Sequence, residues 1–245
     1  MTGVQTCALP ISGIADLSSV HLDRTTSSYT AIMAPDGELI TAVADMALYD
    51  TAISRSFKRA PVQKAASICD AILCDANLSA TAISALFDDI VKRHPVYAMA
   101  ISATKAPRWL EFLPNIACLF MNRFEAAAIT GLPQTTSLGA FAKPLHAKGL
   151  RCAVITAGGE PALFYENETI TLIAPPPTNV VDVTGAGDCL AGTMVAALLH
   201  GSNFIHAAKL GLAAASLTAA RQGAFPVMSL TEIEALAAIH EWNIK

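Results

Sequence analysis

The chain has 245 residues, of which 53% are hydrophobic and 15% charged, so it is long and apolar enough to bury a substantial core. A net charge of −4 without any basic cluster excludes a broad nucleic-acid-binding or membrane-surface footprint. No unbroken apolar run reaches the length of a membrane span. The six cysteines lack Cys-x-x-Cys spacing, which favours buried thiols in a cytoplasmic protein over zinc ligands or disulfides.

The first eleven residues, 1–11, lack the basic start and long apolar stretch of a signal peptide. They resemble an in-frame translation of a common sequencing adapter. We expect this head to be an artefact and the natural gene to begin upstream, and therefore exclude it from reasoning about the fold.

The next predicted element is a β-hairpin. Residues 29–33 and 38–43 favour strands and flank Pro35-Asp36-Gly37, a typical turn. Further strands are predicted at residues 67–73, 96–101, 117–121, 152–156, 162–165 and 169–173. Helices are predicted at residues 79–94, 107–113, 124–130, 136–148, 188–199, 204–220 and 231–242.

Strands that alternate with helices indicate an α/β fold with a parallel sheet covered by helices on both faces. Ligands of such sheets bind beyond the carboxyl ends of the strands. This rule places several polar residues at one edge of the sheet, namely Asp75, Asn77, Asn122, Thr156, Gly158 and the loop 182–188.

The segment Asp182-Val183-Thr184-Gly185-Ala186-Gly187-Asp188 is the strongest functional signal in the chain. It follows an extended Pro-rich run and opens a long apolar segment, which predicts a tight turn followed by a helix. Unpaired N–H groups at the start of a helix attract phosphate oxygens, and a carboxylate beside them can accept a proton from an attacking hydroxyl. The alternative is an ordinary helix start with Asp as a capping residue.

A second motif, Asn122-Arg123-Phe124-Glu125, lies where a predicted strand becomes a helix. Its simplest interpretation is a capping box between Asn122 and Glu125, worth about 1 kcal/mol. A metal-directed role for the Glu125 carboxylate is compatible with that cap.

Together these motifs resemble those of the ribokinase (PfkB-type) family of carbohydrate and nucleoside kinases. The resemblance implies that Gly185, Ala186 and Gly187 form an anion hole for the γ-phosphate of ATP and that Asp188 is the catalytic base. It also implies that Glu125, in the family's Asn-x-x-Glu motif, acts through water on the Mg²⁺ that accompanies ATP, a cation that prefers oxygen ligands and keeps most of its waters.

The remaining cofactor residues also come from the resemblance. The turn from Thr156 through Gly158 resembles one that lies along the nucleotide in the family, although Pro161 replaces its last glycine. The two glycines at 158–159 could equally form an ordinary hairpin turn. Residues 221–224 resemble a loop that binds a monovalent cation such as K⁺ in many members, with Asp182 and the Thr184 carbonyl contributing; Val227 stands where some relatives have a hydroxyl.

The resemblance covers about residues 18–243, and within the family residues 26–33, 42–50, 102–106 and 109–122 look most like pseudouridine kinases. It implies a ribokinase-like fold in which residues 12–45 are the remnant of a β lid and residues 46–245 form the nucleotide-binding and catalytic domain. We expect the nucleotide half of the site to be kept and much of the sugar half to be missing.

The implied reaction moves the γ-phosphate of MgATP to the ribose 5′-hydroxyl of a nucleoside, and the preferred nucleoside is pseudouridine. Two alternatives stay open: a kinase for a free sugar or sugar phosphate, and an ATP-binding fragment without catalysis. The sequence does not decide whether the protein forms a homodimer through its lid, as parts of the family do.

Overall fold

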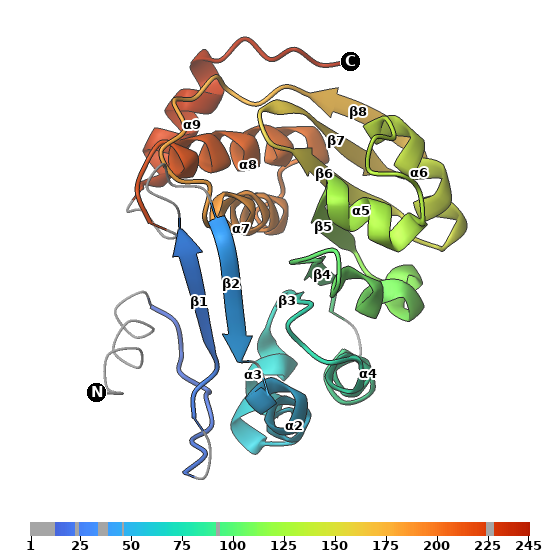
Figure 1. Cartoon of the computed structure of the whole chain (residues 1–245), viewed down its shortest axis with the longest axis vertical. Coiled ribbons are helices and arrows are strands. Elements are labelled where there is room, and N and C mark those ends of the chain that lie inside the picture. The colour runs from blue at the N-terminus through green and yellow to red at the C-terminus, as the bar shows by residue number, and fades with distance from the viewer. Residues whose placement is uncertain (1–12, 23–24, 34–38, 46, 92–93, 224–227) are drawn as a thin grey trace.

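The structure is a computed structural model that describes residues 13–22, 25–33, 39–45, 47–91, 94–223 and 228–245. Its centre is a six-stranded sheet in the order β3-β4-β5-β6-β7-β8 (Figure 1). The strands are β3 (Ile72–Asp75), β4 (Val96–Met99), β5 (Cys118–Asn122), β6 (Cys152–Ala157), β7 (Glu160–Glu166) and β8 (Thr169–Ile173). The head at residues 1–11 lies outside the described residues.

The first four strands of this sheet run parallel, as predicted, and the last three form an antiparallel meander. The connection from β6 to β7 is only the two glycines 158–159, which is too short for the crossover that a parallel pair needs. In the parallel part, Asp75 pairs with Met99 and Asn122 pairs with Thr156, so the carboxyl ends of four strands lie at one edge.

Helices cover both faces of the sheet, because successive side chains of each strand alternate between two apolar cores. Leu119 and Ile155 face the core shared with α4 (Ala80–Asp89), η1 (Ala106–Asn115), α5 (Arg123–Thr130) and α6 (Leu138–Ala147). Phe120 and Val154 face the core shared with α7 (Ala186–Leu199) and α8 (Phe204–Ala219), and α9 (Leu230–Ile239) packs on α8 (Figure 1).

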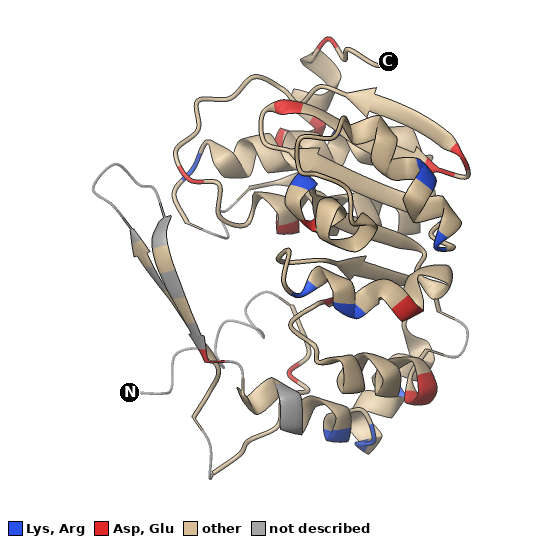
Figure 2. Cartoon of the chain, turned by 45° about the vertical axis from the view of Figure 1, so that its right-hand side comes forward, with Lys and Arg blue, Asp and Glu red and all other residues tan. Residues whose placement is uncertain are grey.

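The predicted hairpin is present as β1 (Ser28–Met33) and β2 (Leu39–Asp45), paired antiparallel with Thr30 opposite Val43. It forms a separate two-stranded sheet that stands beside the α/β body (Figure 2). The predicted turn at residues 35–37 lies outside the described residues. Whether the hairpin acts as a lid over a substrate stays a prediction.

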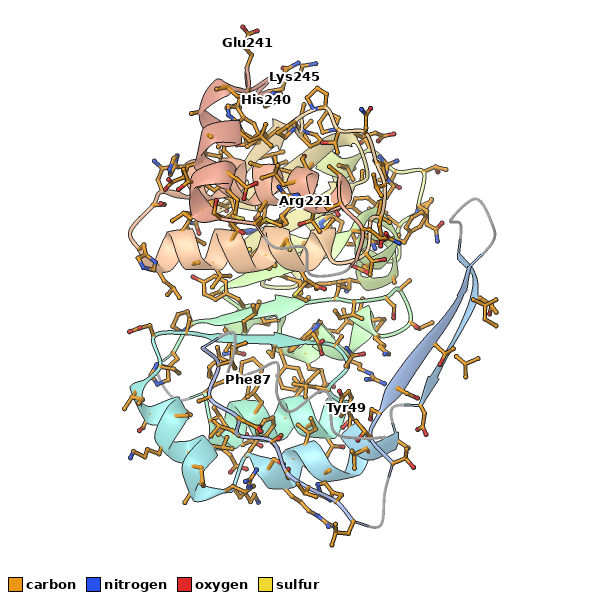
Figure 3. All side chains as sticks on the ribbon, turned by 90° about the vertical axis from the view of Figure 1, so that its left-hand side faces the viewer. Tyr49, Phe87, Arg221, His240, Glu241 and Lys245 are labelled. Carbon is orange, nitrogen blue, oxygen red and sulfur yellow. The ribbon has the colours of Figure 1, made fainter. Side chains whose placement is uncertain are left out.

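Two short helices, α2 (Ala47–Ser56) and α3 (Ala60–Ile68), follow the hairpin at the β3 end of the molecule. Figure 3 shows Tyr49 of α2 and Phe87 of α4 in this part. The Phe87 ring stacks on Phe112 of η1 with centroids 4.9 Å apart, which ties α4 to η1.

Some predicted boundaries were wrong. The strand predicted from residue 67 begins only at Ile72, because the chain up to Ile68 belongs to α3, which starts with a proline in its first turn. Helix α4 ends at Asp89 rather than near residue 94, since the N–H groups of Ile90 and Val91 both bond to the Leu86 carbonyl and close the last turn.

Two helix ends differ as well. Helix α7 begins at Ala186 rather than at Asp188, because Gly185 takes a left-handed conformation and serves as its N-cap. Helix α9 ends at Ile239, and the Trp242 indole N–H then donates to the Ala237 carbonyl at 2.8 Å.

No helix in the described part of the chain is long and apolar enough to cross a membrane. The five cysteines that the structure describes are all free thiols: Cys69, Cys74, Cys118, Cys152 and Cys189.

Candidate active site

A cavity of about 1090 Å³ opens at the carboxyl ends of β4, β5 and β6 and extends along the start of α7. Its lining brings together eight of the ten residues that the resemblance assigns to the site, namely Asn122, Glu125, Thr156, Gly158, Thr184, Ala186, Gly187 and Asp188. The other two adjoin it: Gly185 precedes Ala186 as the helix cap, and Asp182 bonds to the backbone of the neighbouring loop. Asp75 and Asn77, which were also predicted at this edge, are not among the lining residues.

The start of α7 has the geometry of an anion site. Gly185 has a φ of 79°, which favours glycine, and no side chain caps the helix. Within the described chain the backbone N–H groups of Gly187 and Asp188 have no hydrogen-bond partner. Orphan donors at the positive end of a helix dipole attract phosphate oxygens.

Asp188 lies in the first turn of the same helix and lines the cavity. Partial burial of its carboxyl group, together with the nearby negative charge of Asp75, raises the pKa of Asp188 above the usual value for an aspartate. A more basic carboxylate is a better proton acceptor, provided that it stays ionised at the working pH.

Asn122 and Glu125 form a full capping box at the start of α5. The Asn122 Oδ1 accepts from the N–H groups of Phe124 and Glu125, and the Glu125 Oε2 accepts from the Asn122 N–H at 2.7 Å. Glu125 is only 5% exposed, and this burial raises the pKa of its carboxyl group. The capping interpretation is therefore confirmed, and the same carboxylate also lines the cavity.

The predicted hairpin turn between β6 and β7 forms the next part of the wall. Gly158 has a φ of 63°, and Ala157 pairs with Glu160 across the turn. A 2.6 Å salt bridge from Arg123 to Glu160 ties this turn to the start of α5. The ordinary hairpin interpretation is confirmed, and the turn also borders the cavity, so the two interpretations are compatible.

Part of the cavity lining is apolar and was not predicted from the sequence. Its residues are Pro175, Pro176, Pro177, Val180, Val183, Leu212, Ala215 and Ala219. The Ser216 hydroxyl, which also lies there, donates to the Pro176 carbonyl. A cavity that combines apolar lining with an anion site suits a molecule that joins an aromatic base to phosphates. The Pro-rich run was the signal in the sequence.

Asp182 joins two loops rather than lining the cavity. Its carboxylate accepts hydrogen bonds from the N–H groups of Thr184 and Gly223. A hydrogen bond with the Thr184 side chain, followed by these two backbone bonds, lowers the pKa of Asp182. Arg221, labelled in Figure 3, forms a 2.7 Å salt bridge with Glu232 and ties the second loop to α9. Residues 224–227, part of the predicted cation loop, lie outside the described residues, so the monovalent cation site stays a prediction.

Several known proteins resemble the chain. A model of the pfkB family of carbohydrate kinases matches residues 16–229. Pseudouridine kinase of Escherichia coli is 26% identical over 213 residues, which cover 82% of this chain and 66% of that protein. A ribokinase of Arabidopsis thaliana is 31% identical over 48% of this chain and 32% of its own length. The chain thus spans less than two thirds of these curated relatives.

The solved structures agree in fold. A carbohydrate kinase from Agrobacterium tumefaciens has a TM-score of 0.82 and 33% identity, covering 98% of this chain and 78% of that one. Arabidopsis thaliana ribokinase, solved with ribose and ATP, has a TM-score of 0.75 and 19% identity over 90% of this chain and 74% of its own. The chain therefore belongs to the pfkB family of carbohydrate kinases, with a ribokinase-like α/β fold.

Proposed function

We propose that the protein transfers the γ-phosphate of ATP to the 5′-hydroxyl of a nucleoside, with pseudouridine as the preferred acceptor. The observation that carries the proposal is the pairing of orphan backbone donors with a carboxylate in one helical turn, at Gly187 and Asp188. The likeness to pseudouridine kinase, which is 26% identical over 82% of this chain, supports this acceptor; the ribokinase of Arabidopsis thaliana is 31% identical but matches only 48% of the chain.

In this proposal the start of α7 holds the transferring phosphoryl group. The backbone donors of Gly187 and Asp188, preset by the Gly185 turn, point to the oxygens on which charge develops. The Asp188 carboxylate takes the proton of the attacking hydroxyl, and the gain in rate comes from positioning and electrostatics.

The donor nucleotide would lie between the anion site and the apolar wall at residues 175–183, beside the turn at Thr156 and Gly158. The carboxylate of Glu125 fits a water-mediated contact to Mg²⁺ better than a direct one. Both of its oxygens already accept hydrogen bonds from Asn122, at 2.7 and 2.9 Å, and each keeps a lone pair for a metal-bound water. Bound Mg²⁺ would neutralise charge on the transferring phosphoryl group.

The test is coupled ADP release with pseudouridine, uridine, ribose and fructose 6-phosphate, combined with calorimetric measurement of ATP binding. It is run on this chain and on a variant that lacks residues 1–11. Release with pseudouridine above the other acceptors supports the proposal. Binding of ATP without release in either protein would leave only a nucleotide-binding module.

A further inference from the structure

A second, smaller cavity lies at the end of the sheet opposite to the candidate active site. It has a volume of about 220 Å³, and its lining comes from the amino ends of β4, β5 and β6, the carboxyl end of β7, and the ends of α7 and α8 that face them. Organic ligands occupy cavities of about 300–1,000 Å³. This cavity therefore suits a guest smaller than a typical organic ligand.

The floor of the cavity is a row of side chains from four neighbouring strands. Tyr97 pairs with Cys118 in the register of β4 and β5, and Cys152 pairs with Glu166 in the register of β6 and β7. One residue before the first pair of β5 and β6, Cys118 stands beside Cys152. Tyr97, Cys118 and Cys152 all pack in the core shared with α7 and α8, so they point to the same face of the sheet. The row thus presents two adjacent thiols between a phenol and a carboxylate.

The hydroxyl group of Tyr97 lacks a partner. Tyr97 is 9% exposed and lines the cavity, and its hydroxyl makes no hydrogen bond to any residue that the structure describes. A buried hydroxyl without a partner costs about 1–3 kcal/mol. A thiolate beside it would accept its hydrogen bond, which makes the hydroxyl a second indication of a ligand in this cavity.

The spacing of the two thiols fits a metal ion better than a disulfide. Neighbouring strands lie about 4.8 Å apart, whereas a disulfide needs Cβ atoms about 3.8 Å apart. Two metal–thiolate bonds of about 2.3 Å in a line span about 4.6 Å, which is close to the strand spacing. Both cysteines are free thiols in the structure. A linear sulfur–metal–sulfur bridge therefore needs little movement of β5 or β6.

The donor set selects the kind of metal. In the described part of the chain, no group of three or more His, Cys, Asp or Glu side chains could hold a metal ion, which rules out a tetrahedral Zn²⁺ site there. Two thiolates alone suit a soft monovalent ion that accepts two ligands. Cu(I) is such an ion, and thiolate ligands select it in proteins.

We propose that Cys118 and Cys152 bind one Cu(I) ion in a linear two-coordinate site, with the Tyr97 hydroxyl donating a hydrogen bond to one of the thiolates. On binding, two S–H bonds break, two Cu–S bonds form, and two protons pass to the solvent. The copper stays Cu(I), so no oxidant or reductant takes part. This inference does not depend on the kinase function proposed above.

The opening of the cavity lets an ion reach the thiols. Arg151, Glu166 and Asn167 line it and are exposed, and the Asn167 N–H donates to the Arg151 carbonyl at 2.9 Å. Below them, Cys152 is half-buried and Cys118 is buried. Burial raises the pKa of the Cys118 thiol well above its usual range, so the metal must displace its proton at neutral pH.

The experiment is an anaerobic titration with Cu(I) in competition with bicinchoninate, a chelator that forms a coloured complex with this ion. It compares the parent with Cys118→Ser, Cys152→Ser and the control Cys69→Ser, whose thiol follows α3 and lies outside the cavity. The parent and Cys69→Ser should bind one ion per chain. Loss of one thiolate should weaken binding by about 100-fold or more. The titration is repeated on the variant that lacks residues 1–11, because this head contains Cys7.

Tyr97→Phe separates a role in metal binding from a role in packing. The affinity for Cu(I) should fall by about tenfold, the worth of an outer hydrogen bond to a metal ligand. The melting temperature without copper should stay the same or rise slightly, because the variant removes a buried hydroxyl that lacks a partner. An unchanged affinity in Tyr97→Phe would show that the hydroxyl does not support the site.

Two further measurements test the site directly. One equivalent of Cu(I) should raise the melting temperature of the parent but not of the double variant Cys118→Ser/Cys152→Ser, because only the folded protein holds the two thiols together. X-ray absorption should show two sulfur neighbours around copper; three or more neighbours would contradict the linear site. If Cys118→Ser does not fold, Cys152→Ala at the half-buried position takes its place. Failure of the parent to bind Cu(I), or equal binding by the double variant, would overturn the proposal.

Discussion

Oδ2 of Asp182 accepts a hydrogen bond from the backbone N–H of Gly223 at 3.1 Å, across 41 residues of sequence. Its Oδ1 accepts from the Thr184 N–H at 2.9 Å, so one exposed carboxylate joins the loop before α7 to the loop after α8. The backbone is tied at the same place, because the N–H groups of Val181 and Asp182 both donate to the Ala219 carbonyl. The position of the anion site thus depends on this junction.

We expect Asp182→Ala to lower the melting temperature at neutral pH. The pKa of Asp182 is lowered in the folded protein, so its contribution is present above the unfolded-state pKa of about 4 and is lost as the pH falls through the lower folded-state pKa. The difference in melting temperature from the parent should be constant between about pH 7 and 5 and narrow below about pH 4. A difference independent of pH would contradict this role.

Stability and ATP affinity should move in opposite directions in Gly187→Ala. A Cβ at Gly187 meets nothing within 4 Å, and alanine is the better helix former by about 1 kcal/mol, so the melting temperature should rise slightly. The same Cβ would stand in the cavity beside the anion donors. Calorimetry should show ATP affinity falling by about tenfold or more, with ADP affected less; unchanged ATP affinity would argue against an anion hole at this turn.

Glu125→Gln is expected to change the Mg²⁺ requirement more than the stability. The variant loses a charge-assisted cap bond worth about 1 kcal/mol. It also no longer buries a negative charge, and the cost of burying that charge is what raises the pKa of Glu125 in the parent. The Mg²⁺ concentration for half-maximal turnover should rise severalfold at saturating ATP. If that concentration stays the same while the melting temperature drops sharply, Glu125 is a cap only.

Ile101→Gly tests the strain in a γ-turn after β4, in which the Ser102 N–H donates to the Ala100 carbonyl at 2.8 Å and Ile101 has a φ of 67°. Glycine adopts a φ of 67° freely, so relief of about 1–3 kcal/mol should offset the loss of a side chain that is 37% exposed. The matched control is Ile170→Gly in the regular strand β8, where the side chain is 43% exposed and no strain is relieved. Urea unfolding should therefore show a smaller loss for Ile101→Gly; equal losses would mean that the turn is not strained.

Local signals in the sequence were sufficient for much of the fold. Asn122 and Glu125 cap α5, as their spacing predicted, and Gly131 ends α5 in a left-handed conformation directly after the range predicted for that helix. Ser79 caps α4 at the start of its predicted range. Each of these features depends on hydrogen bonds between residues at most four apart. The parallel arrangement of β3 to β6 also followed from the alternation of strands with helices.

What the sequence did not reveal depends on contacts between distant segments. The run 65–73 is apolar and contains both helix-forming and strand-forming residues, so periodicity alone could not place the boundary between α3 and β3; Pro61 was the usable signal. The γ-turn at Ile101 contradicts local preference. The bond from Lys105 to Asn77 joins residues 28 apart, and no short motif marks it.

The most direct test of the account is pseudouridine-dependent ADP release by the parent and by Asp188→Asn, with ATP binding measured in parallel. If Asp188 is the base, turnover should fall by about 10²- to 10⁴-fold in Asp188→Asn while ATP affinity stays within about threefold, the usual signature of a lost general base. Near-parental turnover in Asp188→Asn would contradict the assignment of Asp188 as the base, and with it the proposed reaction at this cavity.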